Sequence, residues 1–178
     1  MGMKETVDLA RDSATYVLPH ASAVAGREIH MPAVCGGYPE PGTAMQFLPY
    51  GNAGTIKVRI DTRSCGRLTS LCAHELGHAA MYQTNPDLLR ERYGADEHRF
   101  NTLDEGVAET VQFDVQLRLA LRGSPTQLLR AMRKYVFRKI DPMPDAYTGG
   151  FRHVLALRRR GVTLPEIIGD PLRFLPRP

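Results

Sequence analysis

The sequence of 178 residues predicts an α+β fold, in which a small antiparallel sheet is followed by a helical part. Strand-like alternation is confined to the residues before 62, and helical spacing of apolar residues dominates after residue 65. The hydrophobic content of 43% and the charged content of 24% are ordinary for a globular domain of this length. We therefore expect one domain over residues 1–178, with an N-terminal helix and β region (1–65), a helical part (66–161) and a C-terminal tail (162–178).

The N-terminal part predicts one helix and a hairpin. Residues 4 to about 16 have apolar side chains at helical spacing, and Pro19 is expected to end this helix or to lie just beyond it. Residues 27–34 are a weaker strand candidate. Residues 43–48 and 55–61 alternate in a strand-like way around a linker that contains glycine and asparagine, which predicts two antiparallel strands.

The second part predicts four main helices. Typical start and stop residues mark their ends, such as Thr62 and Ser64 before the first helix and Asn85-Pro86 after it. A short helix at 164–168 and an extended tail that contains prolines complete the chain. The helical part follows the sheet, and a cleft is expected where the two meet. The main helices are expected at residues 66–85, about 99–122, 126–138 and about 146–160.

Charge and composition argue against several classes of function. The net charge of +4 is too small to indicate nucleic-acid binding, and the basic residues in 130–139 and 158–160 are typical of solvated helix faces. No apolar run is long enough to span a membrane, and the N-terminus lacks the apolar segment of a signal peptide. Nineteen arginines against four lysines suggest a GC-rich, bacterial genome. We expect a cytoplasmic protein that binds neither membranes nor nucleic acid.

The motif that carries chemistry is His74-Glu75-Leu76-Gly77-His78, which lies in the first of the four main helices. On a helix, residues four apart share one face, so that both imidazoles can reach one small cation. Two neutral nitrogen ligands suit Zn²⁺, and a third ligand would leave a fourth position open for catalysis. Glu75 lies beside that face, where its carboxylate can hold a water without binding the metal.

The third ligand has to come from further along the chain. Glu105 and Glu109 are four residues apart on one face of the next main helix, and that face can lie against the two histidines. His98 stands at an uncertain helix start, whereas Glu91 and Glu97 are typical of solvated surface charges. The residues alone leave the following candidates: Glu91, Asp96, Glu97, His98, Asp104, Glu105 and Glu109.

A resemblance to a known family lies in the segment Leu103-Asp104-Glu105-Gly106-Val107-Ala108-Glu109. This segment resembles the second zinc motif of the gluzincin metallopeptidases, the thermolysin-like and aminopeptidase-like zincins. The resemblance implies that Glu105 is the third ligand of one zinc ion per chain, and that Glu109 hydrogen-bonds a ligating histidine, namely His74. Asp104 replaces the asparagine that is usual in this motif, and Asp104 as the ligand is an alternative. The implied fold is zincin-like, with the active-site cleft between the sheet and the helices.

A second segment, Tyr147-Thr148-Gly149-Gly150, resembles the Tyr-x-x-Gly element of the aminopeptidase-like gluzincins. The resemblance implies that the hydroxyl of Tyr147 stabilises the oxyanion of a tetrahedral intermediate. His153 is a rival donor or substrate contact on the same predicted helix. The family also implies that an edge strand before the metal helix binds extended substrate, and either strand of the predicted hairpin could serve. Gln46 stands where the aminopeptidase motif has a glutamate that binds the free amine of the substrate, which counts against aminopeptidase activity.

Together these features predict a zinc-dependent peptidase that acts on a peptide or protein substrate. Glu75 is expected to act as the general base, and Tyr147 as the donor to the oxyanion. The alternative is a latent or single-partner zinc protein of gluzincin fold without general peptidase activity. A chain of this size builds few substrate subsites, and its C-terminal tail could lie in its own cleft.

Overall fold

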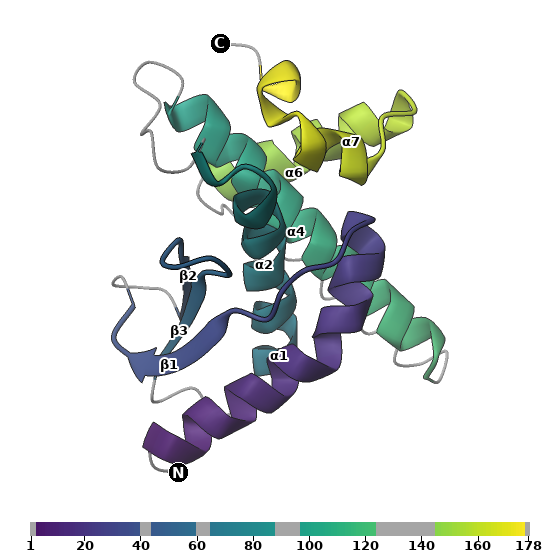
Figure 1. The fold of residues 1–178 in the computed structure, drawn as a ribbon. Helices are drawn as coiled ribbons and strands as arrows, with labels where there is room; N and C mark the ends of the chain where they lie inside the picture. Colours follow the sequence, from purple (N-terminus) through teal and green to yellow (C-terminus); the bar gives the residue numbers. More distant parts are fainter. Residues whose placement is uncertain (1–2, 40–43, 60–64, 88–96, 124–144, 177–178) are drawn as a thin grey trace.

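The computed structural model describes residues 3–39, 44–59, 65–87, 97–123 and 145–176. A three-stranded sheet lies beside a set of helices, which confirms the predicted α+β class (Figure 1). Several predicted features lie outside the described residues. These are the helix at 126–138, the basic residues in 130–139, the N-cap candidates Thr62 and Ser64, and the ligand candidates Glu91 and Asp96.

The sheet consists of β1 (Ala33–Gly37), β2 (Met45–Leu48) and β3 (Thr55–Arg59), in the spatial order β1-β3-β2. Strands β2 and β3 pair antiparallel, as predicted for the hairpin. Strand β1 pairs parallel with β3, so the expectation of a wholly antiparallel sheet is wrong for this strand. The reason is that β3 occupies the centre, where Ile56 and Val58 are fully buried, and the chain passes from β1 to the opposite edge before it turns back.

Strand β1 begins later than the sequence indicates. Residues 27–32 precede it, and backbone groups in this segment bind side chains from helices instead of a neighbouring strand. The backbone N–H of Ile29 donates to the hydroxyl of Ser22, and the N–H of His30 donates to the side chain of Gln83. The amide of Gln83 donates in return to the carbonyl of His30. These side-chain bonds replace the ladder that a longer strand would need.

Helix α1 (Met3–Ala25) runs past Pro19, which the sequence predicts as its end. The burial of one helix face offsets the missing N–H of this exposed proline. The helix ends instead before Gly26, whose φ of 68° favours glycine, and the N–H of Arg27 donates to the carbonyl of Ser22. The fully buried stripe continues on both sides of the proline and consists of Ala10, Ala14, Val17 and Ala21.

Three long helices form the rest of the framework. They are α2 (Cys65–Thr84), α4 (Glu97–Leu121) and α6 (Asp145–Arg159), and each agrees with a predicted helix to within about two residues at either end. Helix α2 packs against both α1 and α4, and α4 packs against α6 (Figure 1). Helix α2 also contacts β2. Together with α1, which contacts β1 and β3, it joins the sheet to the helical part.

The chain ends in a short helix and a 3₁₀ helix. Helix α7 (Leu164–Gly169) confirms the predicted short helix, and a capping box between Thr163 and Glu166 closes its N-terminus. The next segment, η2 (Pro171–Phe174), is a 3₁₀ helix and not the expected extended chain. The buried Pro171 starts this helix, because its fixed φ suits the first helical position.

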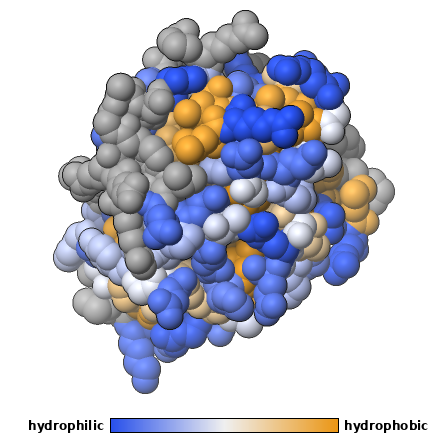
Figure 2. Space-filling model, turned by 45° about the horizontal axis from the view of Figure 1, so that its top comes forward, coloured by the Kyte–Doolittle hydropathy of each residue, from blue (hydrophilic) through white to orange (hydrophobic). Residues whose placement is uncertain are grey.

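The apolar side chains are concentrated inside the protein. Leu76 of α2, and Leu103 and Val107 of α4, are fully buried. The coloured part of the face in Figure 2 is mostly hydrophilic, with its largest hydrophobic area near the top of the view and smaller ones elsewhere. In the described parts of the chain, no helix is both long enough and apolar enough to cross a membrane.

Candidate metal centre

Helices α2 and α4 approach each other closely at the turn that carries the two histidines. Gly77 lies between these histidines in the sequence, and a Cβ atom at this position would lie 2.5 Å from Cα of Ala108. Side chains do not pack this closely against a neighbouring backbone, so only glycine fits here. Gly77 and Ala108 therefore let the two backbones approach, which brings the histidines of α2 within reach of the carboxylates of α4.

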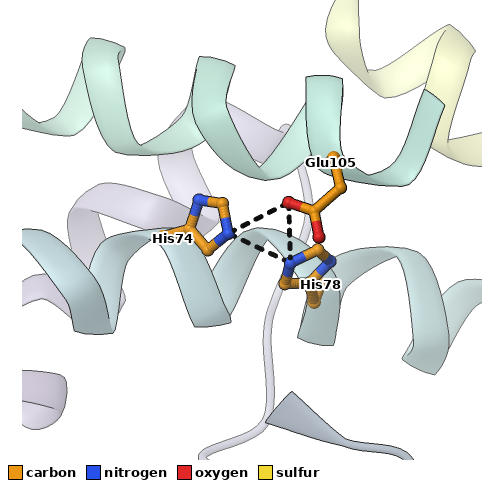
Figure 3. Close-up of side chains that lie close together, drawn as sticks. All are labelled: His74, His78 and Glu105. Atoms are coloured by element: carbon orange, nitrogen blue, oxygen red, sulfur yellow. Dashed lines mark hydrogen bonds and ion pairs between the residues drawn. The ribbon is translucent and has the colours of Figure 1, made fainter. Parts of the chain in front are cut away.

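The side chains of His74, His78 and Glu105 converge between the two helices (Figure 3). Nε2 of His74 lies 3.2 Å from Nε2 of His78. Oε2 of Glu105 lies 3.3 Å from the first of these nitrogens and 3.7 Å from the second. A tetrahedral zinc ion with bonds of about 2.0–2.1 Å holds its ligand atoms about 3.3 Å apart. The three atoms therefore have nearly the spacing of three corners of a zinc tetrahedron.

One of the three polar atoms of this triangle is not satisfied by the protein alone. Among the described residues, Oε2 of Glu105 is buried and has no hydrogen-bond partner at favourable geometry. A buried acceptor without a partner costs about 1–3 kcal/mol. A cation bound by Oε2 and by the two Nε2 atoms would remove this cost. Two imidazoles and one carboxylate are a common ligand set for zinc, so the residues fit that metal.

Each of the two histidines also has a carboxylate beside its Nδ1 atom, the ring nitrogen that is not part of the triangle. Oδ2 of Asp104 lies 2.8 Å from Nδ1 of His78, and Oε1 of Glu109 lies 3.5 Å from Nδ1 of His74. Each carboxylate favours a proton on Nδ1, which leaves the lone pair of Nε2 free to bind a metal. Glu109 thus lies beside His74, the histidine that the gluzincin resemblance implies as its partner. Asp104 faces the outer nitrogen of His78, so the third corner of the triangle is Glu105 and not Asp104.

The histidines and carboxylates shift one another's ionisation. Burial lowers the pKa of His78, but the charges of Asp104 and Glu105 outweigh burial and raise this pKa to about 10. Burial raises the pKa of Glu105, but the two histidines outweigh burial and lower this pKa below its ordinary value. In the metal-free protein His78 therefore carries a proton at neutral pH, which a binding metal has to displace.

Glu75 lies next to the triangle and is almost completely buried, with 4% of its surface exposed. Burial raises the pKa of its carboxyl group above the ordinary value, although His74 and His78 oppose this shift. The backbone N–H of Phe47 in β2 donates a hydrogen bond to the same carboxyl group. A carboxyl group with a raised pKa is suited to accept and return a proton near neutral pH.

Helix α6 contributes Tyr147. Its ring stacks on that of His74, with centroids 6.0 Å apart and 25° between the planes. Its hydroxyl donates a hydrogen bond to Glu105, and its pKa is raised by burial and by the nearby carboxylates, so the phenol stays neutral. His153, the rival donor, lies elsewhere, because its Nε2 donates to the backbone carbonyl of Phe174 at 2.7 Å.

The triangle opens into a pocket of about 230 Å³ between the sheet and the helices. Of the two candidate strands, β3 is central and β2 is an edge, and it is β2 that borders the pocket. Glu97 and His98, at the start of α4, are exposed and lie outside its described lining. The described residues that line the pocket are Met45, Gln46, Phe47, Pro49, His74, Glu75, His78, Asp104, Glu105 and Tyr147.

Two parts of this site were missed by sequence reasoning. The hydrogen bond from Phe47 to Glu75 and the contact of Pro49 with the pocket both depend on how β2 lies across α2. No motif in the sequence marks either of them. The close approach at Gly77 does have a signal, because a glycine inside a buried helix is otherwise unfavourable.

Asp104→Asn is expected to weaken zinc binding by about tenfold, because loss of an outer carboxylate lowers metal affinity by about 10- to 100-fold. The amide oxygen of the variant can still accept the hydrogen bond from Nδ1 of His78, so the substitution removes the charge and keeps the contact. The same charge raises the pKa of His78, and a proton on this ring competes with zinc. Without this charge the pKa of His78 is lower in the variant, so a proton competes less with zinc at about pH 7 and part of the lost affinity is compensated. This compensation disappears as the pH rises, so the advantage of the wild type in zinc affinity should widen from about pH 7 to about pH 9.

Competition of each protein against one zinc chelator, in the same buffer at each pH, measures this difference. Glu97→Gln is the control, since it also removes a carboxylate from the first part of α4 but at an exposed position. Equal zinc affinities of Asp104→Asn and the wild type at about pH 9 would contradict the role of Asp104.

In comparisons with protein-family models, with curated proteins and with solved structures, the chain matches none of them. The geometry of the site and the resemblance of its short motifs are therefore the basis of a functional proposal.

Proposed function

We propose that this protein is a zinc-dependent peptidase. The observation that carries the proposal is the triangle of His74, His78 and Glu105, together with a buried carboxyl group, Glu75, that is not one of its corners. A metal held by three protein ligands keeps a coordination position open, as catalytic zinc sites do. Bound zinc would supply an electrophile for a carbonyl oxygen and would make water a good nucleophile at neutral pH.

The chain's own residues would handle the protons and the developing charge. Glu75 would take a proton from the attacking water and would return it to the amine that leaves. Burial raises the pKa of Glu75 above its ordinary value, which makes its carboxylate a stronger base toward the proton of the water. Tyr147 would donate a hydrogen bond to the carbonyl oxygen as negative charge develops there. Asp104 and Glu109 would keep the two imidazoles in the tautomer and orientation that bind a metal.

The edge of the sheet supports an extended peptide as the substrate. Strand β2 borders the pocket, and an extended chain can pair with an edge strand through backbone hydrogen bonds. Met45, Phe47 and Pro49 make the same wall largely apolar. Gln46 offers no carboxylate for a free N-terminal amine. This combination favours cleavage within a peptide chain over removal of its first residue.

Incubation of the zinc-loaded protein with a diverse peptide mixture, followed by mass spectrometry of the products, tests the proposal. Cleavage is expected with zinc-loaded protein, is expected to disappear when a chelator removes the metal, and is expected to return when zinc is added back. Cleavage at an unchanged rate by fully zinc-free protein would contradict the proposal.

Protein that binds one zinc ion per chain and cleaves nothing would favour the alternative, a zinc protein dedicated to one partner. The described tail does not favour blockage of the pocket by the chain's own C-terminus. Arg99 donates to the carbonyl of Pro176, and His153 donates to that of Phe174. Within the described residues, no part of the chain from α7 to Pro176 lines the pocket.

A further inference from the structure

Helices α4 and α6 touch at two glycines that have no part in the proposed chemistry, Gly106 and Gly150. A Cβ atom on Gly150 would overlap the carbonyl oxygen of Thr102 and would lie 2.8 Å from the backbone nitrogen of Gly106. A Cβ atom on Gly106 would in turn overlap the carbonyl of Gly150 and lie 2.9 Å from its Cα. Backbone therefore packs directly on backbone, and neither helix can accept a methyl group here without moving away.

This contact lies next to the candidate metal centre on both helices. Gly150 follows Tyr147 by three residues, so the two lie on the same side of α6. Gly106 directly follows Glu105, which accepts the hydrogen bond from Tyr147. The separation of the helices at the glycines therefore sets how far the ring of Tyr147 reaches toward Glu105 and His74.

Substitution of the neighbouring Gly149 by alanine is a control that changes helix propensity without changing the packing of α6 on α4. Glycine inside a helix is less favourable than alanine, and α6 contains two glycines in succession. A Cβ atom on the exposed Gly149 would meet only Cγ2 of Thr102, at 4.0 Å, which is an ordinary van der Waals distance. Packing thus accepts alanine at position 149 and excludes it at position 150.

We propose that Gly150 is a positioning residue, whose backbone contact with Gly106 holds α6 close enough for Tyr147 to reach Glu105 and a developing oxyanion. The part that concerns the oxyanion rests on the proposed peptidase function, whereas the part that concerns Glu105 applies to the folded protein alone. A methyl group added at position 150 should therefore move Tyr147 whether or not the protein cleaves peptides. Any loss of turnover should depend on the hydroxyl of Tyr147.

The first experiment observes Tyr147 without any reaction. The chain has seven tyrosines, and labelling with ¹³C at tyrosine Cζ gives each of them its own NMR signal. Tyr147→Phe identifies the signal of Tyr147 by its disappearance. Gly150→Ala is expected to shift this signal, and Gly149→Ala is expected to leave it in place. An unmoved signal in Gly150→Ala, or an equal shift in Gly149→Ala, overturns the proposal.

Two further variants separate positioning from a general loss of stability. Val154 is fully buried one turn further along α6, and Val154→Ala loosens the packing of this helix without an added methyl group. Its Tyr147 signal is expected to stay in place. Gly106→Ala adds a methyl group to the same contact from the other helix and is expected to shift the signal as Gly150→Ala does. If neither Gly106→Ala nor Gly150→Ala folds, the contact is needed for folding and not for positioning, and the proposal is overturned.

The second experiment is kinetic and uses zinc-loaded protein with the peptide that the wild type cleaves fastest in the diverse mixture. Tyr147→Phe is expected to lower kcat by about 10²-fold or more, and Gly150→Ala by about tenfold or more, with smaller changes in KM. In the Tyr147→Phe background, Gly150→Ala should change kcat by less than about twofold, because the group that it positions is already absent.

Equal losses of kcat in the two backgrounds would overturn the proposal. If the wild type cleaves no peptide, the proposed function fails, and the NMR experiment still decides whether Gly150 positions Tyr147. The two failures are therefore distinguishable.

Discussion

Replacement of Glu75 by glutamine is expected to lower peptide cleavage by about 10²- to 10⁴-fold and to leave one zinc ion bound per chain. The factor is the usual contribution of a general acid or base. The metal ligands stay complete, because the triangle consists of His74, His78 and Glu105. Glutamine has almost the same shape and can still accept the hydrogen bond from the N–H of Phe47, so the wall of the pocket is preserved.

The same variant is expected to be at least as stable as the wild type when zinc is absent. Burial raises the pKa of Glu75 in the folded protein, so folding favours its protonated form. A carboxyl group of this kind contributes stability at low pH and loses it as the pH rises through the folded pKa. As the pH rises above the ordinary glutamate pKa of 4.5, the melting temperature of the zinc-free wild type should therefore fall relative to that of Glu75→Gln.

Cleavage rate, zinc content and thermal melting of the variant and the wild type check both expectations. Glu97→Gln is the matched control, because it makes the same exchange at an exposed position on α4. Cleavage by Glu75→Gln at the wild-type rate would exclude Glu75 as the general base. Loss of zinc from this variant would show instead that Glu75 helps to hold the metal.

Gly77→Ala is expected to weaken zinc binding by about 10²-fold, and cleavage at limiting zinc should fall with it. The new Cβ atom would lie 2.5 Å from Cα of Ala108, so α2 and α4 must move apart. This movement takes His74 and His78 on α2 away from Glu105 on α4. Zinc sites tolerate deviations of only about 0.2 Å in ligand distance, so the movement weakens the site. Overpacking of this kind also costs about 1–3 kcal/mol of folding free energy.

Zinc affinity by chelator competition and thermal melting of the zinc-free protein measure the two effects separately. Gly169→Ala in α7 is the control, because a Cβ atom there meets nothing within 4 Å. Wild-type zinc affinity in Gly77→Ala would refute the link between helix approach and the metal site. A loss of stability alone would assign Gly77 to core packing.

The parts of the fold that depend on local spacing could be predicted from the sequence. Helices α2, α4 and α6 follow from apolar periodicity and end signals, and the hairpin of β2 and β3 follows from alternation around a turn. The parallel pairing of β1 could not be predicted, because it depends on which strand takes the centre of the sheet. Pro19 is a misleading stop signal, since the burial of α1 along its whole length outweighs a local preference.

The candidate site divides in the same way. The spacing of His74 and His78 places them on one face of one helix, so their convergence could be foreseen from the sequence. Adjacent residues of a helix point about 100° apart, and only the packing of α4 on α2 decides whether Glu105 or Asp104 faces the histidines. The contact between β2 and Glu75 joins a strand to a helix and has no local signature.

The hydrogen bond from Phe47 to Glu75 also protects an open edge of the sheet. An edge strand presents unpaired backbone groups that a second copy of the chain could extend into an intermolecular sheet. Strand β2 has only four residues, Pro49 follows it directly, and one of its N–H groups already donates to a carboxylate of the same chain. The residue proposed as the general base thereby limits the pairing of β2 with a second copy of the chain. A peptide substrate that pairs with β2 would likewise have to use the other backbone groups of this strand.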